Sequence, residues 1–161
     1  MSKKLAMKIP EPFFAVINAV MRFLLRSRIH FLVSGNLMLI TFIGRNSGRQ
    51  FTTPVRYFMS DEIVRCFTSA EGQWWRNMRG GADVVLRIEG RDAPYQAKAV
   101  ENDPEYVEKW FRHYLDLFPQ DAAYHEIRTS KDKSLVSEDF EKALRSAILV
   151  EAKPTPGGND T

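Results

Sequence analysis

Alternating apolar and polar positions along the middle of the chain predict a series of short β-strands. The runs are rich in β-branched and aromatic residues, and glycine, asparagine, aspartate or serine separate most of them. The predicted strands cover residues 37–43, 52–58, 62–69, 84–89, 95–100 and 147–150. Five or six strands joined by tight turns are typical of a small barrel.

Helical periodicity is clearest after residue 103. Asp103 and Pro104 suit the N-cap and the first helical position, and Pro119 ends the helix. Its apolar face consists of Val107, Trp110, Phe111, Tyr114, Leu115 and Phe118. Shorter helices are expected at 13–25 and 137–145, a single helical turn at 74–78, and a polar loop or frayed helix at 124–134. The expected fold is mainly β with α (α+β), with the N-terminal helix and the long helix packed on the barrel.

Length and composition indicate one globular domain. The chain has 161 residues, of which 44% are hydrophobic, and a net charge of +3. We expect an N-terminal segment at 1–29, a barrel domain at 30–153 and a disordered tail at 154–161. The single cysteine, Cys66, excludes an internal disulfide and suits a half-buried structural thiol.

Positive charge gathers at the start of the chain. Residues 1–30 carry Lys3, Lys4, Lys8, Arg22, Arg26 and Arg28 against the single acidic residue Glu11. The uncharged run 12–21 is far shorter than the roughly 20 residues that a bilayer span requires. Residues 1–28 could contact an anionic membrane face peripherally, pack on the barrel, or lie across a dimer interface. The rest of the chain is slightly acidic, so we expect no nucleic-acid partner. We also expect a cytoplasmic protein.

The turn between the first two strands, residues 44–51, has the composition of an anion site. It combines two glycines with a serine hydroxyl and two arginines, and successive N–H groups of such a turn can form a concave nest. An ordinary solvated hairpin tip is the alternative.

Other catalytic patterns are missing from the sequence. The three histidines, His30, His113 and His125, are scattered without metal-ligand spacing, and no nucleophile elbow or phosphate-binding glycine loop occurs. This absence is compatible with a flavin enzyme, because the cofactor supplies the hydride chemistry there.

Three ordered motifs resemble the deazaflavin-dependent nitroreductase and quinone reductase family. They are G-R-N-S-G at 44–48, T-T-P-V at 52–55 and W-W-R-N-M at 74–78. The resemblance runs from about His30 to the end of the chain. It implies a split β-barrel, a deazaflavin coenzyme or FMN as cofactor, a homodimer, and hydride transfer to a small planar acceptor such as a quinone or nitroaromatic.

The resemblance also implies roles for individual residues. The cofactor phosphate and ribose would meet Arg45, Asn46, Ser47, Gly48, Arg49, Thr53 and Pro54. Ser69 would contact the ring system, and Trp74, Trp75 and Asn77 would border it, although either tryptophan could instead be simple core. Tyr124 would be the catalytic residue, donating a hydrogen bond to a substrate oxygen.

Two departures from the family pattern leave a second function open. Asn46 and Phe51 stand where family members usually carry basic residues, and only 70–73 remain of a longer loop before the tryptophans. Arg49 offers a compensating cation. The alternative function is a non-catalytic binder of a lipid, fatty acid or other apolar ligand, associated with the membrane through residues 1–28; a structural protein on this fold is a third.

Overall fold

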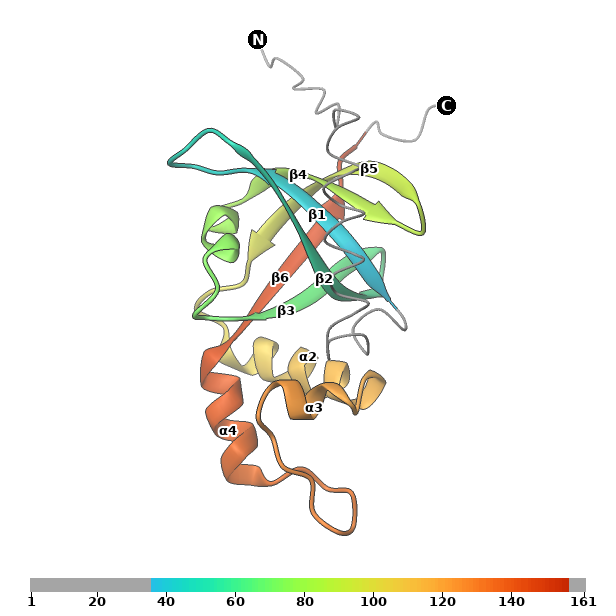
Figure 1. The fold of residues 1–161 in the computed structure, drawn as a ribbon, viewed down its shortest axis with the longest axis vertical. Coiled ribbons are helices and arrows are strands. Elements are labelled where there is room, and N and C mark those ends of the chain that lie inside the picture. Colours follow the sequence, from blue (N-terminus) through green and yellow to red (C-terminus); the bar gives the residue numbers. More distant parts are fainter. Residues whose placement is uncertain (1–35, 157–161) are drawn as a thin grey trace, which may run out of the picture.

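Six antiparallel strands close into a barrel in the computed structural model, which describes residues 36–156 (Figure 1). The strands are β1 (Leu37–Ile43), β2 (Gln50–Ser60), β3 (Ile63–Ser69), β4 (Ala82–Ile88), β5 (Arg91–Ala99) and β6 (Ala147–Pro154). They pair in the order β1-β2-β3-β6-β5-β4, and β4 returns to β1. Each strand therefore has a partner on both sides, which leaves no open sheet edge in this barrel.

The period-2 pattern of β1 fixes which side chains enter the barrel. Met38, Ile40 and Phe42 alternate along the strand, are almost fully buried, and belong to one apolar cluster with inward residues of the other strands. Their partners on β2 follow a continuous antiparallel register from Leu37 opposite Arg56 to Ile43 opposite Gln50. The turn between β1 and β2 therefore joins strands whose positions are fixed by the core.

Two prolines lie inside strands rather than at their ends. Pro54 is in β2, whose pairing with β3 begins only at Tyr57, and Pro94 is in β5, whose main pairing with β6 begins at Tyr95. A strand tolerates proline where the missing N–H faces no partner strand. The sequence placed Pro94 at the start of its strand, and that boundary was wrong because β5 begins at Arg91.

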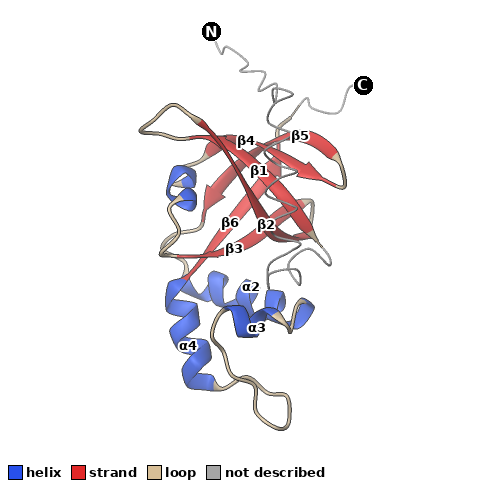
Figure 2. Cartoon of the chain, in the orientation of Figure 1, coloured by secondary structure: helices blue, strands red, loops and turns tan. Residues whose placement is uncertain are grey.

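Helices gather at one end of the barrel (Figure 2). They are α2 (Pro104–Leu117), α3 (Asp121–Tyr124) and α4 (Ser137–Ser146), while the short 3-10 helix η2 (Trp74–Met78) lies at the barrel's side between β3 and β4. Asp103 caps α2 as predicted, since its side chain accepts a hydrogen bond from the Tyr106 N–H at 3.2 Å. The amphipathic face of α2 packs with residues of β3, α4 and β6 in a second apolar cluster.

Two buried arginines link the barrel to this helical end. Arg56 of β2 lies 2.8 Å from the Asp121 carboxylate of α3, and the side chains of both are nearly inaccessible. Arg65 of β3 lies 2.8 Å from Glu151 of β6, and its guanidinium stacks 3.7 Å from the centre of a Trp110 ring. The second core thus contains paired charges among its aromatic side chains, as buried charges require.

The predicted α+β split β-barrel of about six antiparallel strands with a long packed helix is confirmed. All six strands occur where the pattern placed them, with ends shifted by a few residues. The sequence predicted a polar loop or frayed helix at 124–134. In the structure, the helix α3 begins earlier, at Asp121, and ends at Tyr124, and an isolated β-bridge between Thr129 and Leu135 follows it. The expected N-terminal helix, its proposed membrane or dimer contact, and most of the C-terminal tail lie outside the described residues. None of the helices in 36–156 combines the length and apolar character needed to cross a bilayer.

Candidate functional site at the turn between β1 and β2

The turn after β1 is closed by its own backbone. The Gly44 N–H donates to the Arg49 carbonyl at 2.8 Å, and the Gly48 N–H donates to the Gly44 carbonyl at 2.9 Å. Gly48 has a φ of 65°, which a residue with a Cβ adopts at a cost. A Cβ on Gly44 would lie 2.7 Å from both the Ser47 hydroxyl and the Phe51 ring, so a larger residue there would displace these two side chains.

Several hydrogen-bond donors at this turn are left free. The backbone N–H groups of Asn46 and Ser47, and the guanidinium of Arg49, have no protein partner among residues 36–156. The Ser47 hydroxyl accepts from the Arg49 N–H at 3.2 Å. At the base of the turn, the Gln50 Nε2 atom is buried and finds no acceptor in the described part of the chain. Free donors within one turn, one of them buried, are what an anionic ligand would satisfy.

The turn contacts the tryptophan-bearing helix η2 directly. The Arg45 N–H donates to the Asn77 side-chain carbonyl at 2.9 Å, and the Asn77 amide donates to the Trp74 carbonyl at 2.9 Å. The Arg45 guanidinium reaches past the helix to the carbonyl oxygens of Arg79 and Gly81. Two motifs separated by about thirty residues are therefore joined by one asparagine and one arginine.

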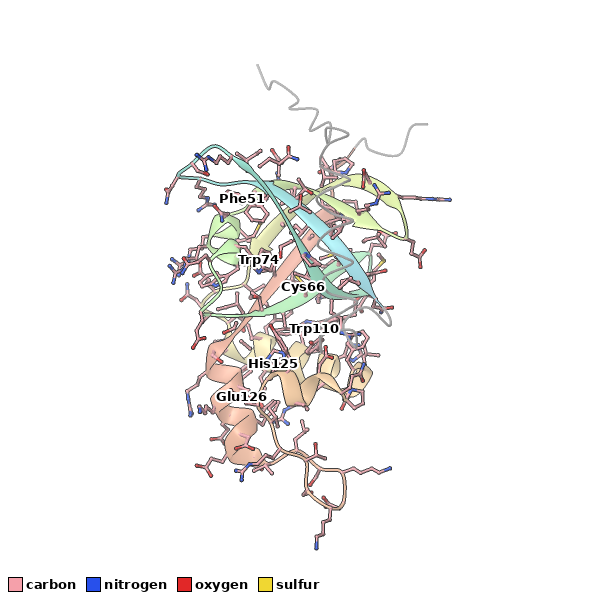
Figure 3. All side chains as sticks on the ribbon, viewed as in Figure 1. Phe51, Cys66, Trp74, Trp110, His125 and Glu126 are labelled. Carbon is pink, nitrogen blue, oxygen red and sulfur yellow. The ribbon has the colours of Figure 1, made fainter. Side chains whose placement is uncertain are left out.

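The two tryptophans of the motif have different environments. Trp75 is 4% exposed and belongs to the barrel core, with its indole N–H 3.4 Å from the Ala70 carbonyl. Trp74 is half-buried at the barrel's side, with its ring centre 6.3 Å from that of Phe42. Phe51 lies further toward the end of the barrel that bears the turn (Figure 3). Phe42 stacks on Phe51 at 5.8 Å between ring centres, and Phe51 remains 45% exposed. Trp74 and Phe51 thus form an accessible aromatic surface beside the turn, whereas Trp75 is core.

The other predicted cofactor contacts lie on the strands leading away from this surface. Thr53 and Pro54 are half-buried on β2, opposite Ile40 and Leu39 of β1. Ser69 ends β3, where its hydroxyl accepts the Glu71 N–H at 3.3 Å and so shapes the short loop before η2. The structure therefore gathers the turn, η2 and the exposed aromatic side chains at one place.

Tyr124 is not brought to that place. It is the last residue of α3, at the opposite end of the barrel from the turn, and its side chain is 56% exposed (Figure 1). Its ring packs edge-on against His125 at 5.2 Å. A hollow of about 500 Å³ opens beside α3, lined partly by Ala122, Ala123 and Glu126. The predicted substrate contact of Tyr124 remains a prediction.

The buried charges around α3 were not predicted from the sequence. Asp121 is fully buried, and its Oδ2 atom meets both Arg56 and the Tyr114 hydroxyl. Burial and this carboxylate raise the pKa of Tyr114, and burial lowers the pKa of His125 beneath its ordinary value. The available signal was a charged residue in the middle of an apolar strand, as at Arg56 and Arg65.

Two further expectations can be compared with the structure. Cys66 was predicted to be half-buried, but it is only 2% exposed within the barrel core. Burial raises the pKa of its thiol to about 12, which suits a structural thiol and not a nucleophile. In the part of the chain that the structure describes, no three histidine, cysteine or acidic residues lie close enough to hold a metal ion.

Comparison with known proteins gives one family. The model of the F420H(2)-dependent quinone reductase family matches residues 21–136. No curated protein sequence matches the chain.

Solved structures supply relatives of low identity. The protein Atu2129 of Agrobacterium tumefaciens, described as of unknown function, is 16% identical over 96% of this chain and 62% of its own, with a TM-score of 0.53. The FAD and heme binding protein of Mycobacterium smegmatis is 14% identical over 84% of this chain and 74% of its own, with a TM-score of 0.45. An F420-H2 dependent reductase, FDR-A, is 15% identical over 72% and 93%, with a TM-score of 0.45. The first of these shows a shared fold.

Proposed function

This chain belongs to the F420H(2)-dependent quinone reductase family, and we propose that it transfers a hydride from reduced F420, the deazaflavin coenzyme, to a quinone or a similar planar acceptor. Membership makes it a deazaflavin-dependent oxidoreductase that acts on a small molecule. The proposal adds where the coenzyme binds and which class of acceptor is reduced. It rests most directly on the contact between the turn at 44–49 and helix η2 through Asn77.

The residues at the turn fit the anionic part of such a coenzyme. The free N–H groups of Asn46 and Ser47 and the guanidinium of Arg49 can donate to phosphate oxygens, and the orphaned Gln50 amide offers a further donor nearby. Hydrogen bonds to a charged acceptor are worth about 1.5–3 kcal/mol each, so two or three of them would hold the ligand. Exposed Phe51 and half-buried Trp74 can cover an apolar ring face and keep water from it.

The protein's own contribution is mainly position. When bound, the reduced deazaflavin supplies the hydride, and the aromatic surface beside the turn would orient the acceptor and exclude water. The turn at 44–51 carries no acidic side chain and no histidine, so acceptor protonation by solvent suits this site. The alternative, which the family resemblance implies, is that the Tyr124 hydroxyl donates a hydrogen bond to an oxygen of the acceptor. This alternative requires a ligand that reaches the helical end of the barrel.

A titration decides the function. Purified protein is titrated with F420 and, in parallel, with FMN, followed by tryptophan fluorescence, because Trp74 borders the proposed site. We expect saturable F420 binding, and oxidation of the reduced coenzyme when a soluble benzoquinone is added. If neither F420 nor FMN binds at tens of micromolar, the proposal is refuted. A bound acyl chain in native mass spectrometry would favour the apolar-ligand alternative.

Three other predictions concern assembly and location. A homodimer, a cytoplasmic location and peripheral membrane contact through residues 1–28 rest on the sequence alone. Analytical ultracentrifugation tests the dimer, and co-sedimentation with anionic vesicles tests the membrane contact. Recovery of all protein in the supernatant at low salt would remove the membrane hypothesis.

A further inference from the structure

The two arginines of the turn have different surroundings. Arg49 is exposed, and its guanidinium contacts no acidic side chain or carbonyl of the described residues. The Nη2 atom of Arg45 donates to the Arg79 carbonyl and, at 3.3 Å, to the Gly81 carbonyl. That nitrogen is therefore within hydrogen-bonding reach of two carbonyls of the protein's own backbone.

The backbone after η2 is shaped to receive Arg45. Gly80 and Gly81 have φ values of 75° and 102°, a conformation that glycine adopts without strain. The Gly81 N–H donates to the Met78 carbonyl at 3.1 Å, which closes this bend, and the carbonyls of Arg79 and Gly81 then reach the same guanidinium. The two glycines thus do more than end the helix, because the bend that they form places two carbonyls within reach of Arg45.

We propose that Arg45 is a positioning residue and that Arg49 is the arginine that contacts the anionic ligand. The hydrogen bonds of the Arg45 guanidinium form a clasp that holds the turn against the 79–81 backbone. This assignment rests on the function proposed above, and it divides between two residues the role that the sequence motif gives to both. The Arg45 N–H adds a second point of attachment through Asn77. Removal of the clasp would free the turn from η2 and so weaken a ligand that bridges the two.

The roles predict opposite responses to lysine. A guanidinium presents a planar fork of donors, whereas an ammonium is a point charge on a flexible stem. Both contacts of Arg45 come from the outermost nitrogen of its guanidinium, which lies one bond beyond the reach of a lysine ammonium. Arg45→Lys should therefore raise the Kd for F420 about tenfold, as Arg45→Gln should. A contact with a phosphate needs mainly the charge, so Arg49→Lys should keep the Kd within about twofold, while Arg49→Gln raises it about tenfold.

Amide hydrogen exchange on the ligand-free protein tests the clasp without the coenzyme. In Arg45→Lys and Arg45→Gln, the amides of Arg45, Arg79 and Gly81 should exchange severalfold faster than in the wild type, because their hydrogen-bonded surroundings loosen. The Arg49 variants, and the control Arg91→Lys at an exposed position of β5, should leave these amides unchanged.

Salt dependence adds an independent measurement. Arg49→Gln should flatten the fall in F420 affinity with rising salt, whereas Arg45→Lys should keep the wild-type slope. Wild-type affinity together with wild-type exchange in Arg45→Lys would overturn the proposal. So would weakened binding in Arg45→Gln with unchanged exchange, since Arg45 would then be a direct ligand. Failure of the wild type to bind F420 would refute only the function, because the exchange experiment decides the clasp by itself.

Discussion

The two ends of the barrel use arginine in opposite ways. At the helical end, Arg56 and Arg65 are buried, each beside a carboxylate and an aromatic ring. At the turn end, Arg45 and Arg49 are exposed, and neither has an acidic partner among the described residues. A buried guanidinium paired with a carboxylate is committed to a partner within the protein, whereas an exposed one without a carboxylate remains able to bind an anion. The position of the carboxylates, more than the number of arginines, therefore distinguishes the two ends and supports the ligand site proposed at the turn.

The largest effect is expected from breaking the buried pair at the helical end. Asp121→Asn leaves the Arg56 charge buried without its carboxylate, and should lower the free energy of unfolding by about 3–5 kcal/mol. Urea denaturation followed by far-UV circular dichroism measures this. Asp92→Asn, which removes the partly exposed partner of Arg87, is the matched control and should cost less than about 1 kcal/mol. Equal losses in the two variants would show that burial does not distinguish the two ends.

A smaller effect is expected from adding a charge at the turn end. Phe51→Lys removes the ring stacked on Phe42 and should cost about 1 kcal/mol of stability. It should also strengthen F420 binding severalfold at low salt, because a cation is added beside the free donors of the turn. Isothermal titration at two salt concentrations measures the change. Weaker binding at both concentrations would mean that the proposed contact of the Phe51 ring with the coenzyme contributes more than an added charge does.

The helical end should also respond to acid through His125. Burial lowers its pKa in the folded state below 6.5, so the unfolded chain binds the proton more readily than the folded one. The contribution of His125 to stability is therefore fully present above pH 6.5 and is lost as the pH falls below that value. Unfolding curves between pH 5 and 8 should show this slope in the wild type and a flatter one in His125→Gln. An unchanged slope would place the titration elsewhere.

The smallest effect is expected at Cys66, between the two ends, where the thiol should hardly react in the native protein. Its thiol is enclosed in the barrel core and its pKa is raised to about 12, so almost no thiolate is present at neutral pH. A thiol reagent such as DTNB should react only on unfolding, with a rate that follows the denaturant concentration. Rapid reaction in the native protein would show that the barrel wall opens locally.

The sequence predicts this fold well where the information is local. The alternation in 37–43 and the glycine-bounded turn after it give β1 with its observed ends, and Asp103 and Pro104 give the start of α2. The motif residues of the turn and of η2 also lie together, as the family resemblance implied. The ion pair of Arg56 with Asp121 could not be predicted, because the two residues lie far apart in the sequence. A single charged residue in a sequence is also normally expected to be exposed to solvent. The distance of Tyr124 from the turn is likewise set by how α2 and α3 pack, which no local pattern records.

The ring of strands also has a consequence for biosynthesis. β6 is the last strand in chain order, yet it lies between β3 and β5, so the circle is incomplete until residues 147–154 have left the ribosome. Until then β3 and β5 each present a row of unpaired backbone groups, which other chains can join. A nascent chain that stalls before Ala147 should therefore be prone to aggregation. A fusion partner placed after β6 needs a linker long enough for this strand to insert.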